Sequence, residues 1–256
     1  MSEVGPARAR RFPWVLAVLA TVVLALLLAL GTWQMQRLAW KEALIATIDS
    51  RIASAPLSLA GIEEMHASGG DVDYQPARVA GRFLHDRERH FFATHEGQSG
   101  WYVYTPLALA DGRSVLVNRG FVPYDRKNPA SRVEGQVAGD VEITGLARNA
   151  LDGKPSSLLP DNEPDKNIYY WKDLAGMADD AGLAPEAVLP FFIDADRAPN
   201  PGGLPVGGVT IVAMPNSHLQ YAVTWYGLAL ALAGVFAVWI VRWRGARSAA
   251  NTDARP

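Results

Sequence analysis

Two long apolar runs lie near the two ends of the chain. Residues 14–31 contain Thr21 as their only polar side chain, and residues 221–243 carry no charge before Arg242. A helix rising about 1.5 Å per residue needs roughly 20 apolar residues to cross a bilayer core of about 30 Å. The pattern therefore predicts two transmembrane helices, over residues 13–31 and 218–241.

The first run has a second interpretation, as a cleaved export signal. Residues 29–31 (Ala-Leu-Gly) have the small-x-small pattern of a cleavage site, and Arg10-Arg11 has the form of a twin-arginine signal. The apolar stretch is longer than the roughly 7–15 residues usual in signal peptides, and nothing after the arginine pair supports a twin-arginine signal. An uncleaved helix is the favoured interpretation.

Basic residues flank the two runs on their outer sides. Arginines stand before the first run at positions 8, 10 and 11, and after the second run at positions 242, 244 and 247. Because cytoplasmic flanks favour Lys and Arg, residues 1–12 and 242–256 are predicted to be cytoplasmic. Residues 32–217 then form an exported domain. No transit-peptide composition precedes the first run, so we expect a bacterial inner membrane with a periplasmic domain.

The segment after the first run continues the helical pattern. Residues 32–54 lack Pro and Gly, and their apolar positions recur at helical spacing, which predicts a leading helix that ends before Pro56. Gln34, Arg37 and Lys41 lie together on another face of this helix.

From residue 74 onward the period changes from helical spacing to alternation. Apolar and polar side chains alternate in short segments, and Asp111-Gly112 is a strong hairpin signal. The predicted strands cover residues 77–83, 89–94, 101–107, 114–118 and 141–146. Their connections are too short for crossover helices, which favours an antiparallel sheet. The predicted fold class is a membrane protein of α+β type, with two transmembrane helices flanking an exported, antiparallel β-rich domain.

The last third of this domain is less regular. Residues 169–177 have the pattern of a short helix, and residues 209–213 could form a last strand. Residues 188–194 predict a strand, and Pro190 favours an edge position because proline cannot donate a ladder hydrogen bond.

Composition narrows the possible functions. The formal charge is −2 and no basic stripe is present, so nothing points to nucleic acid. The chain contains no cysteine, which excludes a disulfide framework, a thiolate metal site and a cysteine nucleophile.

Polar residues with possible chemistry gather where the second apolar run begins. His218, Tyr221 and Trp225 stand at i, i+3 and i+7, which places them on one face of a helix that begins near His218. Interfacial aromatic and histidine side chains are also common simply because they are amphipathic.

Other candidate sites are weaker. His85, His90 and His95 are evenly spaced, but a spacing of five puts successive side chains on opposite faces of a strand, so surface histidines are favoured over a metal site. A membrane-tethered hydrolase would need an activated nucleophile, and Gly97-Gln98-Ser99-Gly100 is followed by Trp101 where the nucleophile-elbow pattern requires Gly.

Three strings, in order, resemble the SURF1/Shy1 family. Leu-Gly-Thr-Trp-Gln at 30–34, with Arg37 and Lys41, is similar to the family's first-helix signature. Residues 100–107 and 116–123 resemble its central block, apart from Phe121, where Trp is expected. Residues 216–225 resemble the segment that leads into its second helix.

The resemblance implies a non-enzymatic accessory protein of cytochrome c oxidase assembly that spans the inner membrane twice. Bacterial members of the family are implied to bind haem a and to help pass it to subunit I of the oxidase, and this chain is expected to bind haem a at the membrane boundary. Subunit I and membrane lipid are the expected partners, and a haem a synthase is a further candidate. A histidine matching His218 is the family's proposed axial ligand of the haem iron.

The resemblance and the residues together give a candidate site. The cofactor-binding candidates are His218, Tyr221, Trp225, Arg37 and Gln34. Gln34 is expected to hydrogen-bond across the two helices, and the helices to pack so that Arg37 comes within reach of the His218 region. Arg37 and Lys41 could pair with haem propionates.

Two interpretations stay open beside this site. Asn118 and Arg119 are candidate partner contacts, and the alternative is that Arg119 satisfies carbonyl and carboxylate groups inside the domain. The alternative function is a cofactor-free membrane scaffold that stabilises oxidase assembly intermediates.

Overall fold

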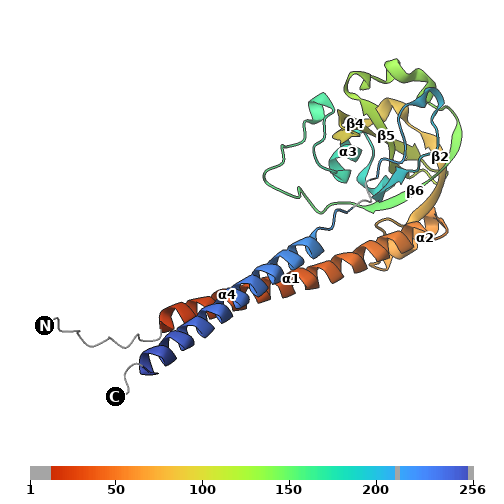
Figure 1. The fold of residues 1–256 in the computed structure, drawn as a ribbon. Coiled ribbons are helices and arrows are strands. Elements are labelled where there is room, and N and C mark those ends of the chain that lie inside the picture. Colours follow the sequence, from red (N-terminus) through yellow and green to blue (C-terminus); the bar gives the residue numbers. More distant parts are fainter. Residues whose placement is uncertain (1–12, 211–213, 253–256) are drawn as a thin grey trace. The chain divides into compact units, whose positions relative to one another are not determined.

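The computed structural model describes residues 13–210 and 214–252 (Figure 1). The chain divides into two compact units. One unit spans residues 1–46 and 213–256 and is helical in its described part, and the other spans residues 47–212 and is β-rich in its described part.

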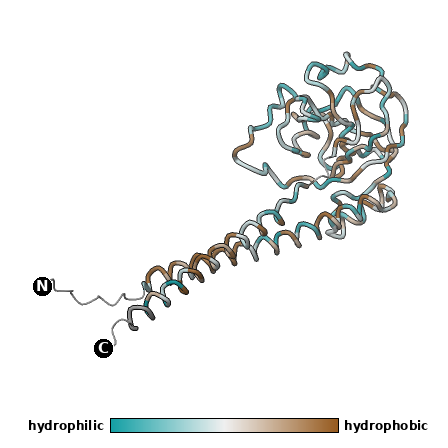
Figure 2. The backbone as a smooth tube through the Cα atoms, viewed as in Figure 1, coloured by the Kyte–Doolittle hydropathy of each residue, from teal (hydrophilic) through white to brown (hydrophobic). Residues whose placement is uncertain are grey.

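The helical unit is built on α1 (Trp14–Ile52) and α4 (His218–Thr252). Both are long and apolar enough to cross a membrane, over Trp14–Ile52 and His218–Arg247. Their apolar residues colour long stretches of both helices (Figure 2), and many of these side chains point outward, as Leu230 does with 76% of its surface exposed. A helix that is apolar on its outer faces needs an apolar surrounding, which a bilayer supplies.

Helix α1 continues without a break past the apolar run. Thr21 and Thr32 donate their hydroxyl protons to the carbonyls of Ala17 and Leu28, four residues back, so their polar groups are satisfied inside the helix. The helix ends at Ile52, close to the end expected before Pro56.

The β-rich domain is a small barrel. Its strands are β2 (Pro76–Phe83), β4 (Gln98–Ala108), β5 (Ser114–Pro123), β6 (Asp140–Asn149) and β7 (Val188–Ala195). They follow the order β2-β6-β7-β5-β4, and β4 pairs again with β2 to close the ring. This order, with β5 and β7 parallel, is that of the OB fold, a five-stranded Greek-key barrel. A fold alone assigns no ligand.

Two further strands and two α-helices of the described residues flank the barrel. β1 (Leu57–Ser58) adds to β2, and β3 (Arg89–His95) adds to β4. α2 (Leu59–Ala67) buries Ile62 in the barrel core, which includes Val79, Leu107, Val115, Val117 and Ile193. α3 (Leu174–Asp180) packs Met177 in a second cluster with Tyr104 and Phe192.

β2 closes the barrel because it forms hydrogen bonds with two strands. It pairs with β6 along most of its length and with β4 at Arg82 and Phe83. Gly81 lies at this change of partner, where an added Cβ would collide with the carbonyl oxygen of Ala108. Glycine permits this close backbone approach.

The structure corrects several expectations for the domain. The sheet is not wholly antiparallel, since β5 and β7 run parallel. β7 is not an edge strand but lies between β5 and β6, and Pro190 is tolerated because the β5–β7 register is interrupted around it.

The predicted helix over residues 169–177 begins later, at Leu174. Tyr169 pairs instead with β3, because its N–H donates to the carbonyl of His90 and its own carbonyl accepts from Phe92. For the expected last strand, Val209 and Thr210 are not in a strand, and residues 211–213 lie outside the described part of the chain.

Candidate functional site

The candidate site lies where α4 begins beside α1 (Figure 1). Three of the hydrogen bonds between described residues connect α1 with α4 or with its lead-in, all within the helical unit. Lys41 donates to the carbonyl of Pro215, Gln34 pairs with His218, and Thr32 pairs with Tyr226. The expectation that the two helices pack against each other is therefore confirmed.

His218 is the first residue of α4, and a carbonyl oxygen fixes its imidazole. Asn216 accepts from the backbone N–H of His218 at 3.3 Å and so forms an Asx turn immediately before the helix. The side-chain oxygen of Gln34 lies 2.7 Å from Nδ1 of His218. A carbonyl oxygen can only accept, so Nδ1 carries a proton, and in the neutral ring Nε2 then carries the lone pair. Among the residues that the structure describes, none bonds this Nε2.

Gln34 is held in place by burial. Only 8% of it is exposed, although it stands on a largely apolar helix. A buried amide without a hydrogen bond would cost about 1–3 kcal/mol, so the bond to His218 stabilises both the helix pair and the orientation of the ring. The expected hydrogen bond across the helices is confirmed.

Of the two expected cations, Arg37 and Lys41, the described contacts bring only Lys41 to the lead-in of α4. Arg37 is exposed, and its guanidinium lies over the ring of Trp40 on the same helix, 4.4 Å from the centroid. Lys41, one turn further on, is the residue that contacts the lead-in to α4 at Pro215. The predicted approach of Arg37 to the His218 region is thus not what the described contacts show, since its side chain turns to Trp40.

Tyr221 and Trp225 follow His218 along α4. Tyr221 is 54% exposed and Trp225 is half-buried, so both leave aromatic surface accessible on α4. Ala222 and Ala229 are buried on the side of α4 that faces α1. Small residues there let the two backbones come close. Whether these residues bind a cofactor stays a prediction.

Asn118 and Arg119 do not form an external contact surface. Each is only 2% exposed. Arg119 donates to the carbonyl of Gly135 and lies 4.8 Å from the ring centroid of Phe83, and Asn118 donates to Asp194 at 3.0 Å. The expected partner-contact role is corrected, because both side chains are buried and make their hydrogen bonds inside the domain.

The three evenly spaced histidines are at least partly buried, which corrects the expectation of surface histidines. His90 is 3% exposed and His85 is half-buried, where its Nε2 lies 2.9 Å from the carbonyl of Val137. Burial lowers the pKa of His85 below its ordinary value, against the raising effect of that hydrogen bond. Within the described ranges, no three His, Asp or Glu side chains form a metal-binding group.

The domain contains a buried ion pair, Glu88 with Arg132, that the sequence did not predict. Arg132 places two N–H groups on the two carboxylate oxygens of Glu88, and Nε2 of His90 lies 3.2 Å from the same carboxylate. The partners stand 44 residues apart, so no local pattern could reveal the pair.

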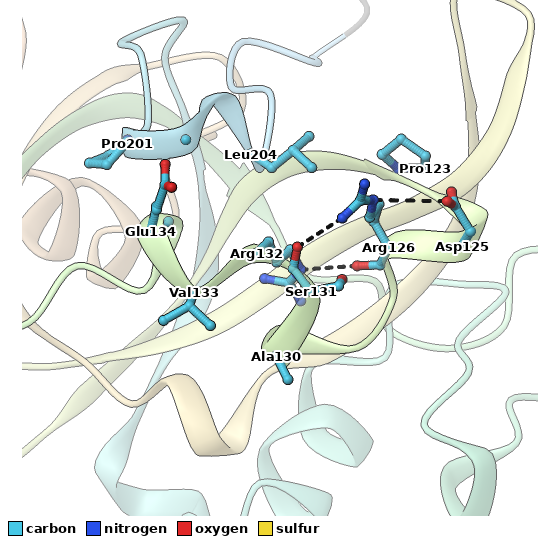
Figure 3. A pocket seen from close by; sticks show the side chains of 12 residues that line it. Pro123, Asp125, Arg126, Ala130, Ser131, Arg132, Val133, Glu134, Pro201 and Leu204 are labelled. Atoms are coloured by element: carbon cyan, nitrogen blue, oxygen red, sulfur yellow. Dashed lines mark hydrogen bonds and ion pairs between the residues drawn. The ribbon is translucent and has the colours of Figure 1, made fainter.

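A hollow of about 470 Å³ lies beside this pair (Figure 3). In the figure Arg126 is directed toward Asp125 and the carbonyl of Ser131, so its charge is already met by neighbours. None of the predicted cofactor-binding residues lines this hollow.

Comparisons with known proteins agree on one family. The model of the SURF1 family matches residues 21–230. Surfeit locus protein 1 of Xenopus tropicalis is 38% identical over 247 residues, covering 90% of this chain and 77% of the relative. The Rattus norvegicus protein of the same name is 40% identical, covering 79% of this chain and 68% of its own length. For Homo sapiens the identity is 38%, with 85% and 74% covered.

Proposed function

The chain belongs to the SURF1 family, and from this premise we propose that it is an assembly factor for haem–copper cytochrome c oxidase. In this proposal it binds haem a at the membrane boundary through His218 and assists haem insertion into subunit I. No catalytic role is part of the proposal.

One observation carries the proposal: the hydrogen bond between Gln34 and His218. A histidine that ligates a metal usually donates its other ring N–H to a carbonyl or carboxylate, which fixes the ring and leaves one nitrogen for the metal. Here Nδ1 is held at 2.7 Å from the Gln34 oxygen, and Nε2 keeps its lone pair. Haem iron accepts such a neutral imidazole, and haem supplies the redox centre that an oxidase needs.

The surroundings suit a flat apolar ring with acidic edges. Tyr221 and Trp225 supply aromatic surface on the same side of α4 as His218. Lys41 supplies a positive charge close to the lead-in of the helix, where a propionate could pair with it. Its ammonium group has further donor protons beside the one directed at Pro215.

The proposal includes a topology. Both termini face the cytoplasm of a bacterial inner membrane and the barrel domain lies in the periplasm, as the flanking arginines favour. Reporter fusions at both ends test this. A carboxyl terminus on the outer side would contradict the proposal.

The cofactor experiment compares His218→Ala with wild type, both purified from cells that make haem a. Wild type should carry a Soret band, and His218→Ala should lose most of it. Adding free imidazole should restore haem binding to His218→Ala, because it supplies the missing ligand.

His66→Ala is the matched control, since His66 lies in the barrel domain on α2. It should keep wild-type haem content. Equal haem in wild type and His218→Ala, or none in either, would favour the scaffold function instead.

A further inference from the structure

The ring of Tyr226 lies directly on Gly31. A Cβ added at Gly31 would stand 2.8 Å from Cε1 and 3.0 Å from Cδ1 and Cζ of this ring. Gly31 is buried, and the tyrosine ring fills the space that any larger residue would need. This contact between α1 and α4 therefore depends on both residues at once.

The hydroxyl of Tyr226 adds a directed hydrogen bond. It lies 3.2 Å from the hydroxyl oxygen of Thr32. Thr32 gives its only hydroxyl proton to the carbonyl of Leu28 at 2.9 Å, so its oxygen must accept and Tyr226 must donate. The tyrosine is thus bound at its ring face and at its tip.

We infer that Tyr226 is a positioning residue: seated on Gly31 and Thr32, it sets the axial register at which Gln34 meets His218. The inference deepens the proposed function and rests on it for its meaning, but the register itself exists without haem.

The spacing along the helices makes this register sensitive. Gln34 lies three residues from Gly31 on α1, and His218 lies eight residues from Tyr226 on α4. At about 1.5 Å per residue the separations are roughly 4.5 and 12 Å, and the long tyrosine side chain, leaning toward the start of its helix, spans the difference. The hydrogen bond between the Gln34 oxygen and Nδ1 of His218 is 2.7 Å long, so a shift of even one residue between the helices would break it.

The test uses the full chain in lipid nanodiscs with ¹⁵N-labelled histidine. The chain has five histidines, and His218→Ala identifies the signals of His218. At a pH where the ring is neutral, wild type should show the form protonated at Nδ1. In Gly31→Ala and in Tyr226→Ala the form protonated at Nε2 should become at least as populated, and haem a affinity should fall about tenfold.

Matched variants separate positioning from general damage. Gly227→Ala makes the same change on α4, where an added Cβ meets nothing within 4 Å, and should behave as wild type. Gly31→Ala combined with Tyr226→Ala should be no worse than Tyr226→Ala alone, because the collision is gone. Tyr226→Phe keeps the ring and loses only the hydroxyl, so it should fold and should lose affinity about threefold.

The outcomes are distinct. The inference is overturned if Tyr226→Phe keeps the wild-type His218 tautomer and haem affinity and if Gly31→Ala or Tyr226→Ala keeps them too. A tautomer shift in these variants, with no haem bound even by wild type, would uphold the register and reject the haem-binding function. If Gly31→Ala and Tyr226→Ala fail to fold, Tyr226→Phe alone decides.

Discussion

The ion pair of Glu88 and Arg132 is buried deeply enough for its loss to be measured. The two side chains are 3% and 1% exposed. Burial alone would raise the pKa of Glu88, but hydrogen bonds from His90 and Arg132 outweigh it and hold that pKa below its ordinary value. The carboxylate therefore stays charged inside the domain, and its charge is met chiefly by Arg132.

Arg132→Met removes this partner and leaves the carboxylate with His90 alone. Breaking a buried pair in this way costs about 3–5 kcal/mol, so the open state of the barrel should become roughly a thousandfold more populated. Replacing both partners, as Glu88→Leu with Arg132→Met, leaves no unpaired charge. The double variant should return to within about 1 kcal/mol of wild type.

Hydrogen exchange with mass spectrometry measures this in the full chain in nanodiscs, on the amides of β4 and β5. Arg126→Met is the control, because its side chain is 50% exposed and its loss should cost less than about 1 kcal/mol. The reasoning is refuted if Arg132→Met exchanges like Arg126→Met, or if the double variant is as unstable as Arg132→Met.

Three further predictions concern other positions. Gly120 has φ +124°, and a Cβ there would collide with the carbonyl of Val206. Gly120→Ala should therefore lower the free energy of unfolding in urea by more than about 3 kcal/mol. The control Gly97→Ala, whose surroundings are open, should lower it by about 1 kcal/mol. The folded state lowers the pKa of His85 below 6.5, so its neutral ring contributes fully to the free energy of unfolding above pH 6.5. This contribution is lost as the pH drops from 6.5 through the folded pKa. In His85→Gln the melting temperature should therefore fall less over this pH range. Gln34→Leu should weaken haem a binding about tenfold in a spectral titration while Gln34→Glu, which keeps an acceptor, largely retains it, and equal affinities would contradict the role of the hydrogen bond.

Local patterns predicted the helices and most strands, because the period of apolar positions is a property of neighbouring residues. They could not predict where β7 lies. Its two neighbours, β5 and β6, are chosen by ring closure, and the break in register that accepts Pro190 exists only in that arrangement. Long-range pairing decided against the edge position that proline alone suggested.

At the candidate site the sequence predicted that Gln34 hydrogen-bonds across the two helices and that Arg37 and Lys41 are nearby cations, but not which cation contacts the lead-in to α4. Gln34 was predictable because a polar side chain on an apolar helix needs a partner. Arg37 and Lys41 share one broad face, and the structure places Arg37 over Trp40 and Lys41 at the carbonyl of Pro215, a choice that no local pattern indicates. No sequence pattern indicated a role for Tyr226, because its ring packs on Gly31 of the other helix, and only the folded structure shows this contact.

The position of β7 has a consequence for how the protein is made. Among the strands of the described residues it is the last to leave the ribosome, yet it fills the gap between β5 and β6. Until residue 195 has emerged, both neighbours expose unpaired edges that invite pairing with other chains. The nascent domain should therefore depend on holding chaperones until synthesis has nearly reached α4, and truncations before residue 188 should aggregate and not form a smaller barrel.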